Sequence, residues 1–158
     1  MNDYHLHHVS VAVPDLSIAI SWYSDLFGLT VERSFDIPEI PARGVFVSGE
    51  GLRLELWQPG TGGDVPAQRQ EPHSDLAEGG TKHIGFAVRG LGDHLRRIAD
   101  RGVRVVAVQR RRGEPMQPVT GNDFGSEPFA AFIADPFGSL IELLDSGLLP
   151  TDEPGDQP

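Results

Sequence analysis

The sequence HVSVAVPDL, from His8 to Leu16, returns later in the chain as HIGFAVRGL, from His83 to Leu91. The two stretches share His, Ala, Val and Leu in the same register, and most other positions are conservative replacements. Each stretch runs into a helical pattern and then reaches a glycine, Gly28 or Gly102. A repeat of this kind indicates that the chain contains two copies of one structural unit.

A second pair of matching segments follows the first pair in the same order. SGEGLRLELWQ (Ser48–Gln58) resembles ADPFGSLIELLD (Ala134–Asp145), and in both a glycine-containing turn precedes a strand with an Ile/Leu-Glu-Leu core. Glu55 and Glu142 occupy the same position in the two copies. Because both pairs occur in the same order, an internal duplication explains them better than chance similarity between short amphipathic strands.

The first segment of each copy alternates as a half-buried strand does. His8 shares one face of the first strand with small residues, whereas Val9, Val11 and Val13 form the other face, and the segment that opens with His83 alternates in the same way. A helix is expected after each strand. Asp15 is a good N-cap for the first helix.

The remaining elements follow from spacing and turn residues. Gly28 suits the left-handed position after the first helix, and the second helix is expected at about 91–101. Further strands are expected at 44–48, 103–108, 129–134 and 140–144. The tight-turn sequence DPFG at 135–138 joins the last two of these as a hairpin.

Each copy is therefore predicted to be a βαβββ module, and the fold class is α+β with two modules in tandem. The first module is expected at 1–58 and the second at 81–146, together forming a single compact domain. A polar, Gly/Pro-rich linker is expected at 59–80. A second long loop covers 109–127, and an acidic tail at 147–158 is expected to be disordered.

Composition excludes several classes of protein. The 158 residues include 13 basic and 23 acidic side chains, a formal charge of −10, which disfavours nucleic acid and anionic membranes as partners. The absence of cysteine excludes disulfides, thiolate metal sites and a cysteine nucleophile. No secretory signal is visible and no apolar stretch approaches 18 residues, so a cytoplasmic protein is expected.

Two histidines and two glutamates occupy matching positions in the copies. His8 and His83 open the first strand of each module, and Glu55 and Glu142 lie in the middle of an apolar strand. A carboxylate in such a strand is costly to bury unless it is paired or binds a metal. If the apolar faces cover the helices, one His and one Glu from each copy can converge in a shared cleft.

These four side chains form a set of nitrogen and oxygen donors. Such a set suits one divalent metal ion, Zn, Ni, Co, Mn or Fe(II), with room for one or two waters. Taken singly, a histidine at the start of a strand is usually an ordinary surface or core residue, and a glutamate on a strand more often faces solvent. Glu55 is also compatible with an ion pair to Arg53 or another arginine. The matching positions in the two copies favour the metal site.

The other histidines have no counterpart in the opposite copy and are interpreted as ordinary residues. They are His5, His7, His73 and His94. Alternation places His7 on the strand face opposite His8, and His94 falls on the second helix. Arg110–Arg112 is interpreted as a solvated loop, with the binding of an anionic substrate as the alternative.

The motifs quoted above resemble those of the vicinal oxygen chelate superfamily. HVSVAVPDL, the helix ending in WYSDLFGL, the strand KHIGFAV and the hairpin DPFGSLIEL carry the resemblance, which covers about residues 6–145. The resemblance implies an open, cup-shaped mixed sheet built from paired βαβββ modules around a metal site. The order His8, Glu55, His83, Glu142 is similar to the ligand set of glyoxalase I.

The resemblance implies a metal-dependent lyase or isomerase of the glyoxalase type. Such an enzyme abstracts a proton next to a metal-chelated oxygen and stabilises an enediolate, with Glu142 as base and Glu55 as its partner, or the reverse. Return of the proton to the same carbon gives instead an epimerase of the methylmalonyl-CoA epimerase type. Those epimerases, however, usually place Gln at the position of Glu55.

Two further alternatives come from the same superfamily: an Fe(II) ring-cleaving dioxygenase and a metal-free antibiotic-binding resistance protein. Members of these kinds usually lack this set of four residues. The expected partner is a small-molecule substrate with vicinal oxygens, and a homodimer is expected, with the site inside one chain or across two. The 59–80 linker and the 109–127 loop do not match the glutathione-binding parts of glyoxalase I, which leaves the thiol cofactor open.

Overall fold

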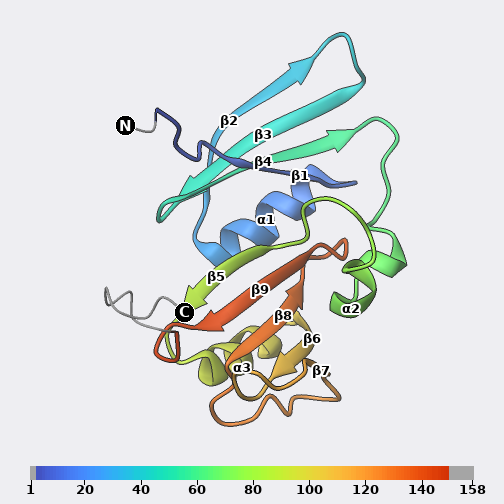
Figure 1. Ribbon diagram of the computed structural model, residues 1–158. Helices are drawn as coiled ribbons and strands as arrows, with labels where there is room; N and C mark the ends of the chain where they lie inside the picture. The colour runs from blue at the N-terminus through green and yellow to red at the C-terminus, as the bar shows by residue number, and fades with distance from the viewer. Residues whose placement is uncertain (1–2, 150–158) are drawn as a thin grey trace. The chain divides into compact units, whose positions relative to one another are not determined.

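The computed structural model describes residues 3–149 of the chain. Contacts between residues divide the chain into two compact units, Met1–Val65 and Pro66–Pro158. Figure 1 shows one sheet and one long helix in each unit. Both units follow the predicted order of strand, helix and three strands, and the second contains one short strand more. The fold class is therefore α+β with two βαβββ modules, as predicted.

The first unit contains β1 (Val9–Ala12), α1 (Leu16–Phe27), β2 (Thr30–Ile37), β3 (Ala42–Gly49) and β4 (Leu52–Pro59). Its strands are ordered β1-β4-β3-β2, with β1 parallel to β4 and the other pairs antiparallel. The helix α1 packs on β3 and β4, where Leu54 and Leu56 are fully buried. We call the opposite face of this sheet, and of its counterpart in the second unit, the open face.

The second unit contains β5 (Ile84–Val88), α3 (Leu91–Asp100), β6 (Arg104–Gln109), β7 (Gln117–Pro118), β8 (Ala130–Ala134) and β9 (Leu140–Asp145). Its strands are ordered β5-β9-β8-β6-β7, and β5 is parallel to β9. The helix α3 packs on β6 and β9, where Ile141 and Leu143 are buried. The short strand β7 lies within the predicted 109–127 loop and has no counterpart in the first unit. Apart from β7, the strands correspond to β1–β4 in order.

Equivalent residues hold the starts of the two long helices. The carboxylate of Asp15 accepts a hydrogen bond from the amide of the third residue of α1 at 3.0 Å, which confirms the predicted N-cap. The Leu16 amide donates to Gln58 Oε1 at 3.0 Å, and the Leu91 amide donates to Asp145 Oδ2 at 2.8 Å. In both units, a side chain from the end of the last strand therefore anchors the first helical amide.

The predicted DPFG turn joins β8 to β9 as a hairpin. Asp135 is 5% exposed, and its Oδ1 accepts hydrogen bonds from the amides of Phe137 at 2.9 Å and Ser139 at 2.7 Å. Gly138 has a φ of 95°, which only glycine adopts without strain. The turn therefore satisfies its buried carboxylate with its own backbone.

The predicted linker contains two short helical segments that the sequence did not indicate, η1 (Ala67–Arg69) and α2 (Pro72–Asp75). Asp75 is 3% exposed, and its Oδ1 lies 2.9 Å from Arg69 Nε and 3.7 Å from Lys82 Nζ. A buried carboxylate needs such cations because burial alone disfavours its charge. The ion pairs therefore fix the segment that leads into β5.

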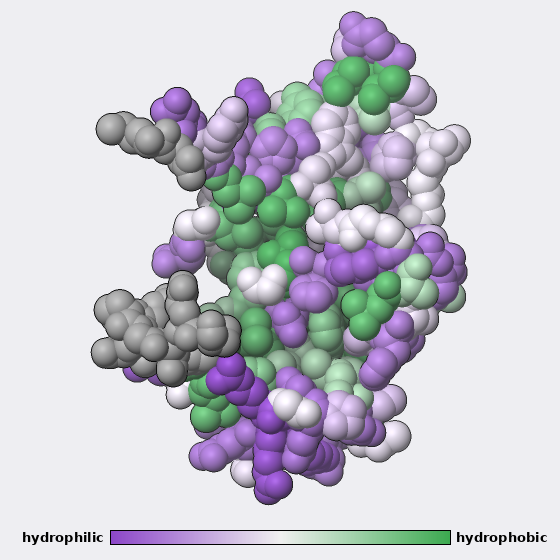
Figure 2. Space-filling view, viewed as in Figure 1, coloured by the Kyte–Doolittle hydropathy of each residue, from purple (hydrophilic) through white to green (hydrophobic). Residues whose placement is uncertain are grey.

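The outer surface carries isolated hydrophobic side chains. Figure 2 shows hydrophobic surface at the tip of the β2–β3 hairpin, where the turn holds Ile40, 51% exposed. Single residues of this kind are common on protein surfaces. Within residues 3–149, no helix is long and apolar enough to cross a membrane. Most of the predicted disordered tail, from residue 150 on, lies outside the described residues.

Candidate metal centre

Strand register places the first His–Glu pair on the open face of its sheet. One row of residues paired across neighbouring strands runs through β1, β4, β3 and β2, and its members are Ser10, Glu55, Phe46 and Arg33. Residues in such a row point to the same side of a sheet. His8 directly precedes β1, and its Nε2 lies 3.3 Å from Glu55 Oε2.

The second unit repeats this arrangement. Gly85, Glu142, Phe132 and Ala107 form the equivalent row across β5, β9, β8 and β6. His83 Nε2 lies 3.2 Å from Glu142 Oε2. The structure thus joins the four predicted residues as two matched pairs, one in each unit.

A phenylalanine holds each histidine ring. The rings of His8 and Phe46 meet edge to face with centroids 5.3 Å apart, and those of His83 and Phe132 do the same at 4.9 Å. The side chains of Glu55 and Glu142 are only 15% and 23% exposed. Neither phenylalanine could be predicted from the sequence, because a single aromatic residue in an apolar strand indicates only that it belongs to the core.

The two sheets also share one irregularity. Pairing between β2 and β3 shifts by one residue between Val31 and Arg33, and pairing between β6 and β8 shifts between Val105 and Ala107. A β-bulge of this kind re-aims the residue that follows it. The common position of the bulge shows that the duplication extends to the second strand of each module, where the sequences look unrelated.

Each His–Glu pair fits a divalent metal ion as half of a site. Donor nitrogen and oxygen atoms bind such ions at about 2.0–2.2 Å, so two donors just over 3 Å apart can share one ion. Among the described residues, no group of three or more His, Asp or Glu gathers at a spacing that could hold a metal. Either pair alone therefore supplies two donors, and a site with four donors needs both pairs.

The structure corrects the predicted orientation of His7. Its Nδ1 lies 2.8 Å from that of His8, and its ring contacts Phe46 and the guanidinium of Arg53 on the open face. Strict alternation fails here because β1 begins only at Val9. Desolvation, followed by the charge of Arg53, lowers the pKa of His7 below its ordinary value.

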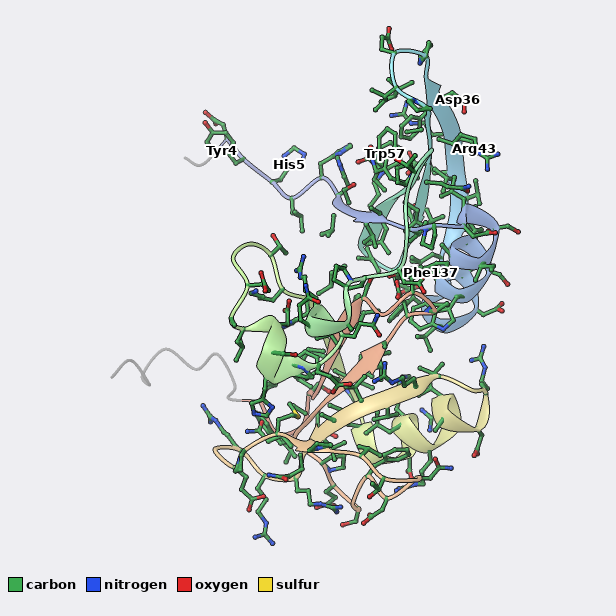
Figure 3. The ribbon with its side chains drawn as sticks, turned by 90° about the vertical axis from the view of Figure 1, so that its right-hand side faces the viewer. Tyr4, His5, Asp36, Arg43, Trp57 and Phe137 are labelled. Carbon is green, nitrogen blue, oxygen red and sulfur yellow. The ribbon has the colours of Figure 1, made fainter. Side chains whose placement is uncertain are left out.

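The remaining histidines lie apart from the pairs. Figure 3 shows Tyr4 and His5 on the segment before β1, clear of the strands. His94 lies on α3 as predicted, and desolvation lowers the pKa of its ring. His73 lies on α2 and is exposed. None of the three contributes to either His–Glu pair.

Arg53 pairs with Glu32 and not with Glu55, the partner that its position in the sequence suggested. Its guanidinium contacts both carboxylate oxygens of Glu32, at 2.8 and 2.6 Å, rather than Glu55. These hydrogen bonds lower the pKa of Glu32 and raise that of Arg53. The ionisable side chain in contact with Glu55 is therefore His8 rather than Arg53.

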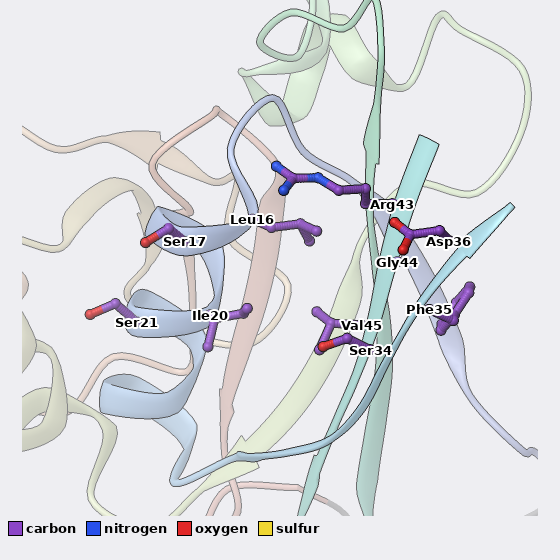
Figure 4. Close-up of a pocket in the computed structure, with 10 residues that line it drawn as sticks. All are labelled: Leu16, Ser17, Ile20, Ser21, Ser34, Phe35, Asp36, Arg43, Gly44 and Val45. Atoms are coloured by element: carbon purple, nitrogen blue, oxygen red, sulfur yellow. The ribbon is translucent and has the colours of Figure 1, made fainter. Parts of the chain in front are cut away.

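A cavity of about 630 Å³ lies elsewhere in the first unit. Figure 4 shows that Leu16, Ile20 and two serines of α1 line one side of it, and residues of β2 and β3 line the other. Arg43 borders it and donates to Gln58 Oε1 at 3.1 Å. Helix α1 forms one side of this cavity and none of the four predicted ligands lines it, so it does not belong to the candidate metal centre.

The chain consists of two βαβββ modules, and each carries a His–Glu pair on its open face. This defines a class of protein with a duplicated set of nitrogen and oxygen donors that suit a metal ion. Residues 7–120 match the family model of the Glyoxalase/Bleomycin resistance protein/Dioxygenase superfamily. The chain belongs to this superfamily, which confirms the resemblance drawn from its motifs.

Sequence relatives include epimerases. The mitochondrial methylmalonyl-CoA epimerase of Mus musculus is 30% identical over 114 residues, which cover 72% of this chain and 62% of the relative. An ethylmalonyl-CoA/methylmalonyl-CoA epimerase of Cereibacter sphaeroides is 29% identical over 111 residues, covering 70% of this chain and 77% of the relative. The chain thus spans less than two thirds of the length of the mouse relative.

Solved structures with the same fold include glyoxalases. Glyoxalase I of Leishmania major, described as trypanothione-dependent, matches with a TM-score of 0.63 and 23% identity, covering 92% of this chain and 88% of that one. A glyoxalase family protein from Enterococcus faecalis matches with a TM-score of 0.66 and 19% identity, covering 92% and 100%. At these identities the likeness establishes the fold.

Proposed function

We propose that this protein is a metal-dependent epimerase that acts on a small acyl-CoA thioester of the 2-substituted malonyl type. One observation carries the proposal: each module presents one His–Glu pair, at the same register position, on its open face. Likeness to methylmalonyl-CoA epimerases over most of the chain favours this reaction among those of the superfamily. The proposal therefore combines a duplicated donor set with a relationship in sequence.

The two His–Glu pairs are proposed to hold one divalent ion together. The ligands are His8, Glu55, His83 and Glu142, and the ion is Zn, Ni, Co, Mn or Fe(II). When bound, the ion supplies Lewis-acid stabilisation of negative charge on the substrate carbonyl oxygen. A homodimer is the proposed assembly, and the two pairs that share an ion belong to one chain or to two.

The two carboxylates are proposed to move the proton. Glu142 accepts the proton of the carbon between the thioester carbonyl and the carboxylate, and the electron pair of the broken C–H bond stays on the substrate. Glu55 delivers a proton to the opposite side of the same carbon, which inverts its configuration. Nε2 of His8 and His83 lies 3.3 and 3.2 Å from these carboxylates, so each pair is placed to share the proposed ion.

Isotope exchange tests this function. Protein loaded with each of the five ions in turn is incubated with methylmalonyl-CoA in D₂O. Deuterium is expected to enter C2, and a single enantiomer is expected to racemise, as followed by mass spectrometry and circular dichroism. Chelator-treated protein is the control. Incorporation at the uncatalysed rate with all five ions would refute the proposal.

Glu55 favours a second candidate, a glyoxalase-type lyase or isomerase. The epimerases that this chain resembles usually carry a glutamine at the position of Glu55. The carboxylate in this chain makes the order of proposed ligands similar to that of glyoxalase I. An assay of methylglyoxal with several thiols distinguishes the candidates. Turnover with a thiol, together with the absence of exchange at methylmalonyl-CoA, would select the glyoxalase reaction.

A further inference from the structure

The two modules differ beside their matched His–Glu pairs. Two strands away from Glu55, the row in the first module ends at Arg33 on β2. Two strands away from Glu142, the equivalent row ends at Ala107 on β6. Both residues directly follow the shared bulge, so a guanidinium in one module takes the place of a methyl group in the other.

Arg33 lies against aromatic rings on the open face. Its guanidinium carbon is 4.9 Å from the ring centroid of Phe46 and 5.8 Å from that of Phe35. The ring of Phe46 also carries His8, at 5.3 Å. A guanidinium that packs on rings still has N–H groups at its edge, and these can bind an oxyanion with two parallel hydrogen bonds.

The aromatic surroundings of Arg33 are themselves well fixed. Phe35 lies over Gly44, where an added Cβ would come within 2.4 Å of the ring. The ring of Phe35 also meets Trp57 edge to face, with centroids 5.0 Å apart. A glycine at this position of β3 therefore makes room for the ring, and the ring supports the guanidinium.

The neighbouring Arg53 has a carboxylate in close contact, whereas Arg33 acts on Glu32 only at longer range. Arg53 also packs on Phe46, with its guanidinium carbon 4.2 Å from the centroid, but both oxygens of Glu32 hold it. Within residues 3–149, no carboxylate comes within 4.0 Å of the guanidinium of Arg33 to form an ion pair. In a chain with 23 acidic and 13 basic residues, a cation in this position is available to a ligand.

The second module has no equivalent group. Ala107 is 4% exposed and belongs to an apolar cluster with Val106, Phe132, Ala134 and Leu140. In register, Val106 and Leu140 replace the ion pair of Glu32 and Arg53. One His–Glu pair therefore has a cationic, aromatic border and the other an aliphatic border.

We propose that Arg33 binds an oxyanion of the substrate beside the His–Glu pair of the first module and so determines specificity for anionic substrates. The inference rests on the proposed function, because an acyl-CoA thioester of malonyl type carries two sources of such an oxyanion. One source is the free carboxylate and the other is a phosphate of the nucleotide. Both fit the planar fork of a guanidinium.

Binding of three compounds to metal-loaded protein tests the inference, with isothermal titration calorimetry as the measurement. Methylmalonyl-CoA carries both oxyanions, methylmalonyl-pantetheine carries only the carboxylate, and propionyl-CoA carries only phosphates. Arg33→Ala is expected to weaken methylmalonyl-CoA binding by about 10- to 100-fold, the size of a charge-assisted interaction. Arg33→Lys is expected to fall between this variant and the wild type.

The chain offers a matched control for this substitution. Arg33→Ala introduces the residue found at the equivalent position of β6, so the sheet is expected to keep its fold, as checked by its melting temperature. Arg97→Ala removes the same charge from the exposed face of α3 and is expected to leave all three affinities within about twofold. Equal affinities of wild type and Arg33→Ala for all three compounds would overturn the inference.

The two partial compounds identify the source. A loss confined to methylmalonyl-pantetheine assigns the carboxylate to Arg33, and a loss confined to propionyl-CoA assigns a phosphate. Titration of the Arg33 side-chain Nε–H resonance with malonate and with 3′,5′-ADP separates this inference from the proposed function. A saturable shift without C2 exchange means that the reaction is wrong and the oxyanion site is right. C2 exchange without any shift of the Arg33 resonance means that the reaction is right and the oxyanion site is wrong.

Discussion

A histidine that is to bind a metal must keep its ring in one orientation, and an aromatic neighbour restrains the ring of each histidine proposed as a ligand. Phe46 and Phe132 meet the rings of His8 and His83 edge to face at 5.3 and 4.9 Å. Contacts of this geometry are favourable by roughly 0.5–1.5 kcal/mol beyond the area that they bury. The histidines and glutamates could be predicted from the repeat, but the phenylalanines could not, because their role depends on register across strands.

Removing one carboxylate at a time is expected to separate the roles of the two glutamates. In a two-base reaction, Glu142→Gln stops proton removal from one enantiomer of methylmalonyl-CoA, and Glu55→Gln stops it from the other. Each variant should lose about 10²- to 10⁴-fold in deuterium exchange with one enantiomer. Exchange is measured separately with the 2R and 2S compounds. If both variants lost deuterium exchange with the same enantiomer, the assignment of one glutamate to each side of C2 would be wrong.

The ion pair between Glu32 and Arg53 is expected to make the free energy of unfolding depend on pH in the acidic range. Hydrogen bonds from Arg53 lower the pKa of Glu32 below 4.5, so the folded state releases this proton more readily than the unfolded state. The resulting stability is fully present above the unfolded pKa and is lost as the pH falls through the folded pKa. Urea unfolding of Glu32→Gln between pH 6 and 3 should show a smaller decline than the wild type. An identical decline would show that the pair adds nothing.

At the scale of elements, the periodicity and turn residues predicted both long helices, the DPFG hairpin and the strands other than β2 and β7, because these features depend on neighbours in sequence. The strand β2 was implied only by the repeated order of the module. The bulges after Val31 and Val105 escaped prediction, since they appear only when two strands are paired. The short helices η1 and α2 escaped as well, because the ion pairs of the buried Asp75 with Arg69 and Lys82 stabilise them rather than local propensity.

The turn between β8 and β9 allows a prediction of stability. Asp135→Ala removes the acceptor of the Phe137 and Ser139 amides in a buried turn and is expected to lower the free energy of unfolding by about 1–3 kcal/mol. Asp93→Ala is the control: its carboxylate is 76% exposed and pairs with Arg96 on the same helix, so it should cost less than about 0.5 kcal/mol. Chemical denaturation measures both. Equal costs would mean that the turn amides find other partners.

At the scale of the whole molecule, the proposed metal site needs donors from both copies of the duplicated module. Each offers one imidazole and one carboxylate, whereas divalent ions of this kind take four or more donors. The proposed shared ion therefore predicts one ion per chain, measured by inductively coupled plasma mass spectrometry after reconstitution. It also predicts a large loss of occupancy when either pair is disrupted. Two ions per chain would mean that the pairs act independently.

Mixing two inactive variants shows which modules share an ion. His8→Ala damages the first pair and Glu142→Ala the second, so each variant alone should have no complete site. If the site lies within one chain, their mixture stays inactive. If a dimer joins the first module of one chain to the second of its partner, half of randomly reassembled dimers are mixed, and each mixed dimer regains one of two sites. C2 exchange should then return to roughly a quarter of the wild-type rate, whereas a mixture of His8→Ala with Glu55→Ala, both in the first module, should recover nothing in either arrangement.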